Sequence, residues 1–280
     1  MNKKWLALYG LKWNPFAAEV PVEALHVSSR VDSFCWRVEQ LVGEGGFALI
    51  TGAPGVGKSV TLRLLAERLS GLRDVQVGVV SRPHASVADF YREMGDLFGA
   101  ELHPHNRWCG AKMLRERWQA HIDACASRPV LLVDEAQEMK QLVLGELRLL
   151  SSARLDSHLL LTVVLAGDQR LIDGFRSEEL LPLASRMRVR LTLERATPEE
   201  LQAHLQHVLT KAGAPKLMTP ELIATLSDHA QGNLRALMNM AGELLALAAQ
   251  REAHQIDEKL FFDTFAPPAT AQAKAVGRRR

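Results

Sequence analysis

The residues from Gly52 to Ser59 read Gly-Ala-Pro-Gly-Val-Gly-Lys-Ser and match the pattern GxxxxGK[ST]. Glycines in such a loop let the backbone turn tightly, so that its N–H groups point at phosphate oxygens. The lysine neutralises the β- and γ-phosphates, and the serine hydroxyl binds Mg²⁺. The sequence therefore predicts a site for ATP and Mg²⁺ made by Gly52, Ala53, Pro54, Gly55, Val56, Gly57, Lys58, Ser59 and Val60.

A second pair of reactive side chains, Asp134 and Glu135, follows the apolar run Val130–Val133, about 75 residues after the loop. An aspartate at the end of a buried strand holds the Mg²⁺ shell in P-loop enzymes. A glutamate beside it can orient an attacking water and accept its proton. The pair predicts ATP hydrolysis and argues against a small-molecule kinase.

Strand-like and helix-like segments alternate around these motifs, and the phosphate-binding loop lies between a strand and a helix, as its pattern requires. Alternation of this kind predicts an α/β fold with a parallel sheet covered on both faces. We expect strands at Phe47–Thr51, Val75–Val80, Val130–Asp134, Leu159–Gly167 and Val189–Leu193, and helices at Ser59–Leu69, Val87–Phe98, Ala111–Ala126 and Met139–Ala153.

From Thr197 onward only helices are expected. Thr197-Pro198-Glu199-Glu200 is a capping box with proline at the first helical position, Thr219-Pro220 opens a second helix, and Asn233–Gln250 reads as a long third one. The predicted domains are an N-terminal segment at 1–29, a core at 30–195, a helical lid at 196–265 and a basic, disordered tail at 266–280.

Composition excludes several other classes. The chain of 280 residues is 47% hydrophobic, too apolar for a disordered protein, and its longest apolar stretch is about half of what a membrane helix needs. Its three cysteines form no CxxC pair, which favours a cytoplasmic protein. The net charge is +2, but four basic groups lie after residue 273, so residues 1–273 carry −2. This charge excludes a surface that is positive overall and leaves only a basic patch or a basic tail.

With these motifs in place, the chain resembles the AAA+ ATPases, a resemblance that implies a five-stranded P-loop core followed by a small helical lid. It implies a sensor 1 residue after the fourth strand, for which Asp168 is the candidate and Gln169 the reserve. It also implies an arginine finger supplied by a neighbouring subunit, with Arg186 preferred to Arg188, and a sensor 2 arginine, Arg235, in Gly232-Asn-Leu-Arg. Each arginine would place positive charge beside the γ-phosphate, and a finger acting in trans requires a homo-oligomer, either a ring or a helical filament.

The opening Tyr9-Gly-Leu-Lys-Trp-Asn-Pro-Phe16 resembles the FGL-x-x-x-PF motif of ExeA-type ATPases, and the resemblance covers residues 9–265. That group includes secretion-associated ATPases and the transposition ATPases of the TnsC, MuB and IstB type. The sequence departs from the group at Gly167-Asp-Gln-Arg-Leu171, where Gly-Gln-Pro-Glu-Leu is expected. Secretion-type members are longer, with a membrane segment after the ATPase, and nothing of that kind follows Phe265.

The transposition type is therefore the main expectation. It implies ATP-dependent assembly on duplex DNA of any sequence, recruitment of a transposase, and hydrolysis that drives disassembly. Two alternatives stay open: a secretion-apparatus ATPase, and a nucleotide-gated scaffold with marginal turnover, against which the intact Asp134 and Glu135 count. Sequence-tolerant DNA binding needs basic side chains aimed at phosphates, for which the candidates are Arg82, Lys112 and Arg115, with His84, Arg107 and Arg117 nearby.

A metal site other than the magnesium site is not expected. His103, His105 and Cys109 form HxHxxxC, which matches no structural zinc pattern. We expect these residues to belong to an ordinary polar loop.

Overall fold

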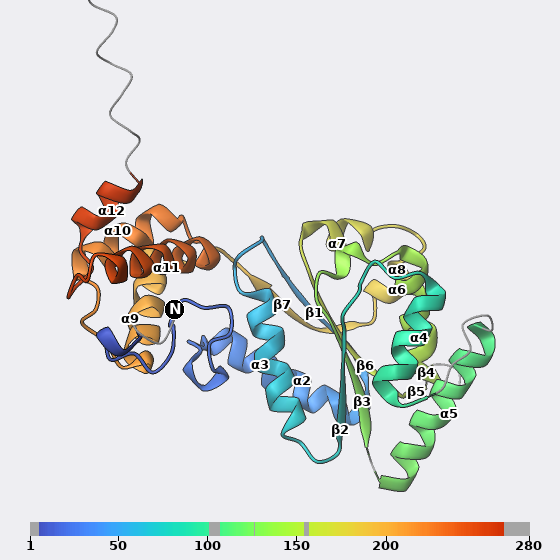
Figure 1. Cartoon of the computed structure of the whole chain (residues 1–280). Coiled ribbons are helices and arrows are strands. Elements are labelled where there is room, and N and C mark those ends of the chain that lie inside the picture. The colour runs from blue at the N-terminus through green and yellow to red at the C-terminus, as the bar shows by residue number, and fades with distance from the viewer. Residues whose placement is uncertain (1–5, 101–106, 126, 154–156, 266–280) are drawn as a thin grey trace, which may run out of the picture. The chain divides into compact units, whose positions relative to one another are not determined.

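The structure is a computed structural model that describes residues 6–100, 107–125, 127–153 and 157–265 (Figure 1). The chain forms two compact units: Val27–Arg195 make one, and Met1–His26 join Ala196–Arg280 to make the other. The expected tail at 266–280 lies outside the described residues.

A five-stranded parallel sheet forms the centre of the first unit, as expected. Its order is β2-β3-β6-β1-β7, so that β1 lies between β6 and β7. In a parallel sheet all carboxyl ends lie at one edge, and ligands bind there. The strands are β1 (Gly46–Gly52), β2 (Val75–Val80), β3 (Arg128–Val133), β6 (Thr162–Gly167) and β7 (Met187–Leu193).

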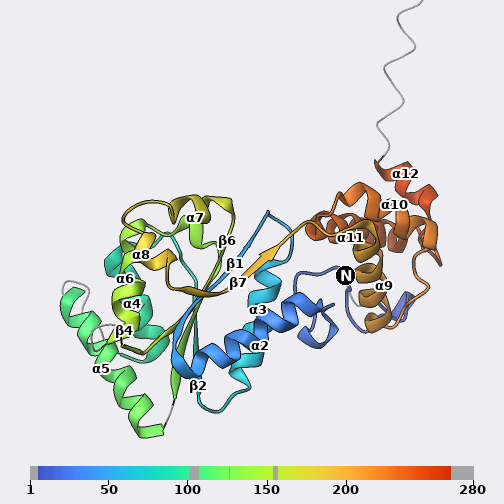
Figure 2. The same ribbon diagram turned by 180° about the vertical axis from the view of Figure 1, so that it is seen from behind.

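Helices cover both faces of this sheet, with α2 and α3 on one side and α4, α5 and α6 on the other (Figures 1 and 2). A buried core under α4–α6 includes Phe98 and Trp118, whose rings meet edge to face with centroids 5.3 Å apart. The helices of this unit are α2 (Ser29–Glu44), α3 (Lys58–Ser70), α4 (Val87–Phe98), α5 (Arg107–Cys125), η2 (Ala136–Glu138), α6 (Gln141–Ser151), α7 (Gln169–Gly174) and α8 (Leu181–Ala184).

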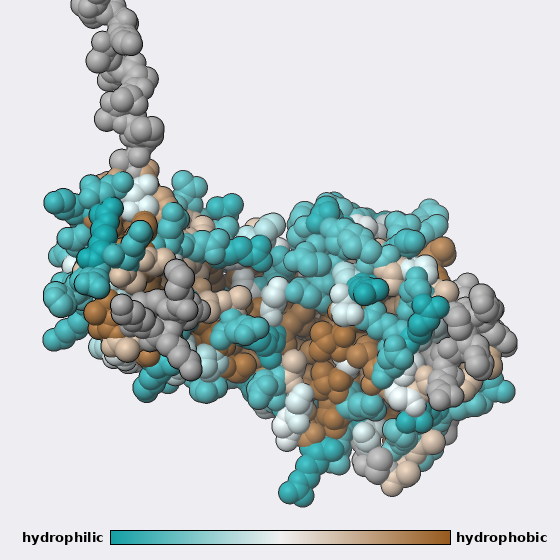
Figure 3. Space-filling view, in the orientation of Figure 1, coloured by the Kyte–Doolittle hydropathy of each residue, from teal (hydrophilic) through white to brown (hydrophobic). Residues whose placement is uncertain are grey.

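The strand β2 forms an edge of the sheet, and the side chain of its residue Val79 is 51% exposed. Figure 3 shows an apolar area in the region of this edge strand, between α3 and α4.

The expectation of one strand over Leu159–Gly167 is wrong. The segment divides into β5 (His158–Leu159), which pairs antiparallel with β4 (Ser152–Ala153), and β6, which begins at Thr162. The N–H of Leu160 donates to the carbonyl of Ser151 over 2.8 Å, so that the first residues of the apolar run bond to the end of α6. Apolar side chains alone do not reveal this change of partner, because both parts of the run are buried or half-buried.

The second unit is helical and contains η1 (Val22–Ala24), α9 (Pro198–Ala212), α10 (Pro220–Ala230), α11 (Leu234–Gln250) and α12 (Glu258–Phe265). The capping box is present: Thr197 Oγ1 accepts from the N–H of Glu200 over 3.3 Å, and Glu200 Oε2 accepts from the N–H of Thr197 over 2.9 Å. Residues of the opening motif pack on these helices, with Leu11 buried and the N–H of Lys12 donating to the carbonyl of Ala212.

Within the part of the chain that the structure describes, the helices are all too short or too polar to cross a bilayer.

Candidate active site

The phosphate-binding loop joins β1 to α3, the strand–loop–helix context that its sequence pattern predicts. Gly55 and Gly57 have φ of 84° and 107°, backbone angles that residues other than glycine rarely adopt. A Cβ at Gly52 would lie 2.6 Å from the carbonyl oxygen of Leu193, so that glycine is required there for close approach to β7. The loop geometry therefore depends on three of its glycines.

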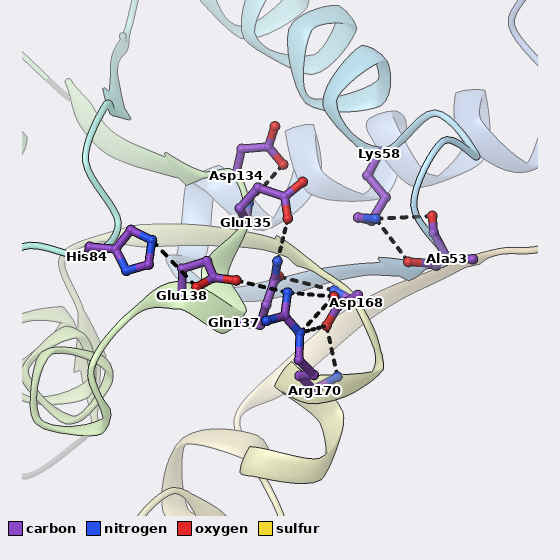
Figure 4. A network of polar contacts seen from close by, with 10 residues as sticks. Ala53, Lys58, His84, Asp134, Glu135, Gln137, Glu138, Asp168 and Arg170 are labelled. Atoms are coloured by element: carbon purple, nitrogen blue, oxygen red, sulfur yellow. Dashed lines mark hydrogen bonds and ion pairs between the residues drawn. The ribbon is translucent and has the colours of Figure 1, made fainter. Parts of the chain in front are cut away.

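Lys58 lies at the start of α3 and is only 5% exposed. Its Nζ donates to the carbonyls of Gly52 over 2.9 Å and of Ala53 over 3.2 Å, which draws the ammonium against the loop (Figure 4). The side chains of Ser59 and Val60 are exposed beside it. A buried ammonium on a glycine-rich loop at a helix N-terminus fits a nucleotide phosphate chain.

Asp134 and Glu135 follow β3 and lie, like Lys58, at the carboxyl ends of the parallel strands (Figure 4). Glu135 adopts a left-handed backbone conformation with φ of 49°, and its N–H donates to Asp134 Oδ1 over 2.9 Å. Such a conformation in a residue other than glycine costs of order 1–3 kcal/mol and clusters at functional sites. The Ser59 hydroxyl and the Asp134 carboxylate are oxygen donors of the kind that Mg²⁺ prefers, so these residues fit the expected metal.

Asp168 caps α7 by accepting from the N–H of Arg170 over 2.9 Å. Its carboxylate also binds the Arg170 guanidinium, whose Nε lies 3.0 Å and whose Nη2 lies 2.9 Å from Oδ2. The side-chain hydrogen bond from Arg170 lowers the pKa of Asp168 from its ordinary value, and the charge of Lys58 adds to this shift. Gln169, the reserve for sensor 1, instead donates to Asp173 over 3.1 Å.

Two further residues join this site that sequence reasoning missed, Gln137 and Arg170. Gln137 bridges Glu135 to the N–H of Asp168, with 3.2 Å between that nitrogen and Gln137 Oε1. Arg170 Nη2 also lies 2.8 Å from Glu138 Oε1. The only signals in the sequence are a glutamine two residues after Glu135 and an arginine where the family pattern expects glutamate.

A recess of about 470 Å³ lies where the phosphate-binding loop meets the loop after β6. It is lined by Thr51, Gly52, Ala53, Pro54, Asp168, Gln169, Arg170, Thr192 and Leu193. The structure thus brings the predicted Asp168 close to the predicted loop, although more than 100 residues separate them in the sequence.

The two candidates for the arginine finger have different surroundings. Arg186 follows α8, is partly exposed, and its Nη1 donates to the carbonyl of Pro182 over 2.6 Å. Arg188 lies on β7 and pairs with Glu44 over 2.7 Å. This ion pair of Arg188 with Glu44 on α2 is compatible with Arg186 as the preferred arginine finger.

Arg235 lies in the first turn of α11, in the helical unit. Asn233 caps that helix by accepting from the N–H of Ala236 over 3.1 Å, and Gly232 has φ of 77°. The motif Gly-Asn-Leu-Arg is therefore a helix start that places an arginine one residue after the first helical position.

The candidate DNA contacts come from two places in the first unit. Arg82 is exposed after β2, and His84 lies 3.5 Å from Glu138. On α5, Lys112 pairs with Glu116 over 3.7 Å, Arg115 is half-buried, and Arg117 donates to the carbonyl of Phe98 over 2.8 Å. Arg107 is the first residue of α5.

Metal-binding clusters of three or more histidine, cysteine or acidic side chains do not occur among the described residues. His103 and His105 lie outside these residues, and Cys109 is exposed on α5.

Comparison with known proteins adds to this geometry. Residues 41–175 match the family described as "AAA domain". Over 253 residues the chain is 29% identical to General secretion pathway protein A of Aeromonas hydrophila, a match that covers 89% of this chain and 45% of that protein. The chain thus spans less than half the length of this curated relative.

Solved structures share the fold at low identity. The Aeropyrum pernix ORC2 protein in ADPNP–ADP complexes matches with a TM-score of 0.71 at 15% identity, over 92% of this chain and 72% of that one. The Aeropyrum pernix ORC1 protein in complex with DNA matches with a TM-score of 0.67 at 16% identity, over 93% of this chain and 68% of that one.

The strand order, the phosphate-binding loop and these matches show the AAA+ fold, in which a P-loop core is followed by a helical region. In sequence, the chain is similar to General secretion pathway protein A over 89% of its length.

Proposed function

We propose that this chain hydrolyses ATP at the carboxyl edge of its sheet and uses the cycle to control its assembly in a secretion pathway. The observation that supports hydrolysis best is the convergence of Lys58, Glu135 and Asp168 at that edge (Figure 4). A nucleotide-gated scaffold would have no need of a held glutamate beside the phosphate-binding loop.

In this proposal the loop N–H groups and Lys58 bind the phosphates, and Glu135 orients a water and accepts its proton. Ser59 and Asp134 would hold Mg²⁺, which supplies charge neutralisation at the phosphates. Arg186 of a neighbouring subunit and Arg235 of the same chain would place positive charge where the transition state becomes negative. Asp168 would serve as sensor 1, with its charge offset by Arg170.

The secretion role is supported by the 253-residue similarity to General secretion pathway protein A. The sequence alone favoured a transposition ATPase over a secretion ATPase. This similarity favours the secretion role, because neither a transposition ATPase nor a transposase partner has support in the comparisons. We place the activity in the cytoplasm, where ATP is available. General secretion pathway protein A is more than twice as long as the region that matches, and its activity is that of the whole protein.

A second candidate function is assembly on duplex DNA. It is favoured by one observation, namely that the structurally similar ORC1 protein is seen in complex with DNA. The exposed Arg82 and Lys112 would contact phosphates, and Arg115 would assist.

The test combines turnover and assembly. The wild-type chain and the Glu135→Gln variant are compared for ATP hydrolysis, for particle size with ATP or ADP, and for binding to two unrelated long duplexes over a salt series. The secretion proposal predicts ATP-dependent assembly with no binding to either duplex at physiological salt. Salt-sensitive, ATP-dependent binding to both duplexes that is lost in Lys58→Ala would replace it with the second candidate. Equal activity of wild type and Glu135→Gln would contradict hydrolysis at this site.

A further inference from the structure

The side chain of Gln137 connects two parts of the site that come from different strands. Its amide lies between the carboxylate of Glu135, after β3, and the N–H of Asp168, after β6 (Figure 4). We propose that Gln137 is a positioning residue that fixes the Glu135 carboxylate to the loop after β6 and so sets the rate of hydrolysis. This inference rests on the proposed role of Glu135 as the residue that orients water.

The direction of the amide is determined by its two partners. Nε2 donates to Glu135 Oε2, and Oε1 accepts from the N–H of Asp168 over 3.2 Å. A primary amide has one accepting end and one donating end. Turning the group over would place its oxygen against a carboxylate and its NH₂ against an N–H, so both contacts would be lost. Only one orientation satisfies both partners.

Gly167 leaves the space that this bridge needs. A Cβ at this position would lie 2.8 Å from Gln137 Oε1 and 2.7 Å from Leu171 Cδ2. Its backbone lies outside the left-handed region, so its conformation does not call for glycine. The absent Cβ is thus explained by what packs there, which includes the Gln137 amide.

The bridge also acts on a residue with a strained backbone. Glu135 has φ of 49°, and the turn η2 that follows it contains Gln137. With Oε2 bound by Gln137, the second carboxylate oxygen of Glu135 is the one that would orient the attacking water in this proposal. Strained backbone conformations persist only where their surroundings hold them, and a displacement of about 1 Å in a reacting group can cost 100-fold in rate.

The loop after β6 is itself held by charge. Arg170 binds both Asp168 and Glu138, so that one guanidinium links the residue after β6 to the residue that follows Gln137. A shift of this loop would reach Glu135 through Gln137. In this proposal Gln137 acts on hydrolysis through Glu135.

The experiment measures kcat and the affinity for ATP separately, in the full chain. Gln137→Ala removes both contacts, whereas Gln137→Glu keeps an acceptor for the Asp168 N–H and removes the donor to Glu135. Gln141→Ala, at the exposed start of α6, is the matched control. We expect both Gln137 variants to lose about 10- to 100-fold in kcat with an unchanged Kd for ATP, and the control to match wild type. A residue that only held the fold would instead change Kd and the midpoint of thermal unfolding.

A double-mutant cycle tests the contact itself. Gly167→Ala should lower kcat in the wild-type background, because its Cβ displaces the Gln137 amide, and should have a smaller effect in the Gln137→Ala background. Fully additive effects would overturn the proposed coupling.

Different results would overturn the role of Gln137 and the proposed ATP hydrolysis. Wild-type kcat in both Gln137 variants, alongside an inactive Glu135→Gln, would overturn the role of Gln137 and leave the proposed function intact. A wild-type chain without turnover, or a fully active Glu135→Gln, would overturn both.

Discussion

The guanidinium of Arg170 holds the carboxylate of Asp168 through two nitrogens, with Nη2 at 2.9 Å and Nε at 3.0 Å from Oδ2. An acid at the sensor 1 position would repel the γ-phosphate if its charge were uncompensated. In the proposed nucleotide site, the ion pair would offset the charge of Asp168 beside the phosphates.

Arg170→Ala should weaken ATP binding about 5- to 10-fold, because it exposes the charge of Asp168 to the phosphates in a partly solvated site. The double variant Asp168→Asn with Arg170→Ala should recover most of this loss. Titration with a fluorescent ATP analogue measures both effects. Arg176→Ala is the matched control, since Arg176 pairs with Asp173 over 3.4 Å, outside the recess. A double variant as weak as Arg170→Ala alone would rule out charge repulsion as the cause.

Lys58→Ala should weaken ATP binding by about 100-fold. Hydrogen bonds to a charged group contribute roughly 1.5–3 kcal/mol, and the Lys58 ammonium is buried where the loop would hold phosphates. Binding is measured by the same titration, with the exposed Lys140→Ala as control. An affinity within a factor of three of wild type would mean that the phosphates bind elsewhere.

Mixing two inactive variants tests whether Arg186 acts on a neighbouring subunit. Arg186→Ala should lose about 1,000-fold in kcat, the usual magnitude for an arginine finger, and Glu135→Gln should be inactive for a different reason. Mixed oligomers contain some sites with both an intact Glu135 and an intact neighbouring Arg186, so activity should return on mixing.

Arg188→Ala is the control for this experiment, because Arg188 pairs with Glu44. It should remain active alone. If mixtures of Arg186→Ala and Glu135→Gln stay inactive while subunit exchange is demonstrated, Arg186 is not a finger in trans.

Short-range patterns predicted the parts of the site that depend on neighbours in sequence. The phosphate-binding loop, Asp134 with Glu135, and the cap at Thr197 each follow from residues within about ten positions, and the structure has these elements where they were expected. The parallel sheet also followed from alternation of strands and helices.

Contacts across strands could not be predicted in the same way. Gln137 reaches Asp168 because β3 and β6 are paired in a particular register, with Val133 opposite Leu165. The sequence carries no mark of that register, since both strands are apolar apart from Arg128 and Thr162 at their starts. For the same reason the division of Leu159–Gly167 was missed.

The stability of the helical unit in acid should depend on His204, which lies on α9. Burial lowers the pKa of His204 from 6.5 to about 4, and the nearby His26 and His207 add to the shift. The ring of His26 lies edge-on to both, with centroids 5.8 Å from His204 and 5.2 Å from His207. Between pH 6.5 and about pH 4 the unfolded chain binds a proton at this position that the folded chain does not.

The free energy of unfolding should therefore fall as the pH is lowered through this window, by at most about 1 kcal/mol per pH unit from this group. His204→Gln removes the titrating group and should flatten the dependence of the unfolding midpoint on pH between 6.5 and 4. Carboxylates also titrate in the lower part of this range, so the informative quantity is the difference in slope between wild type and variant. His254→Gln, at an exposed position, should keep the wild-type slope. Equal slopes for wild type and His204→Gln would show that His204 is as easily protonated in the folded chain as in the unfolded one.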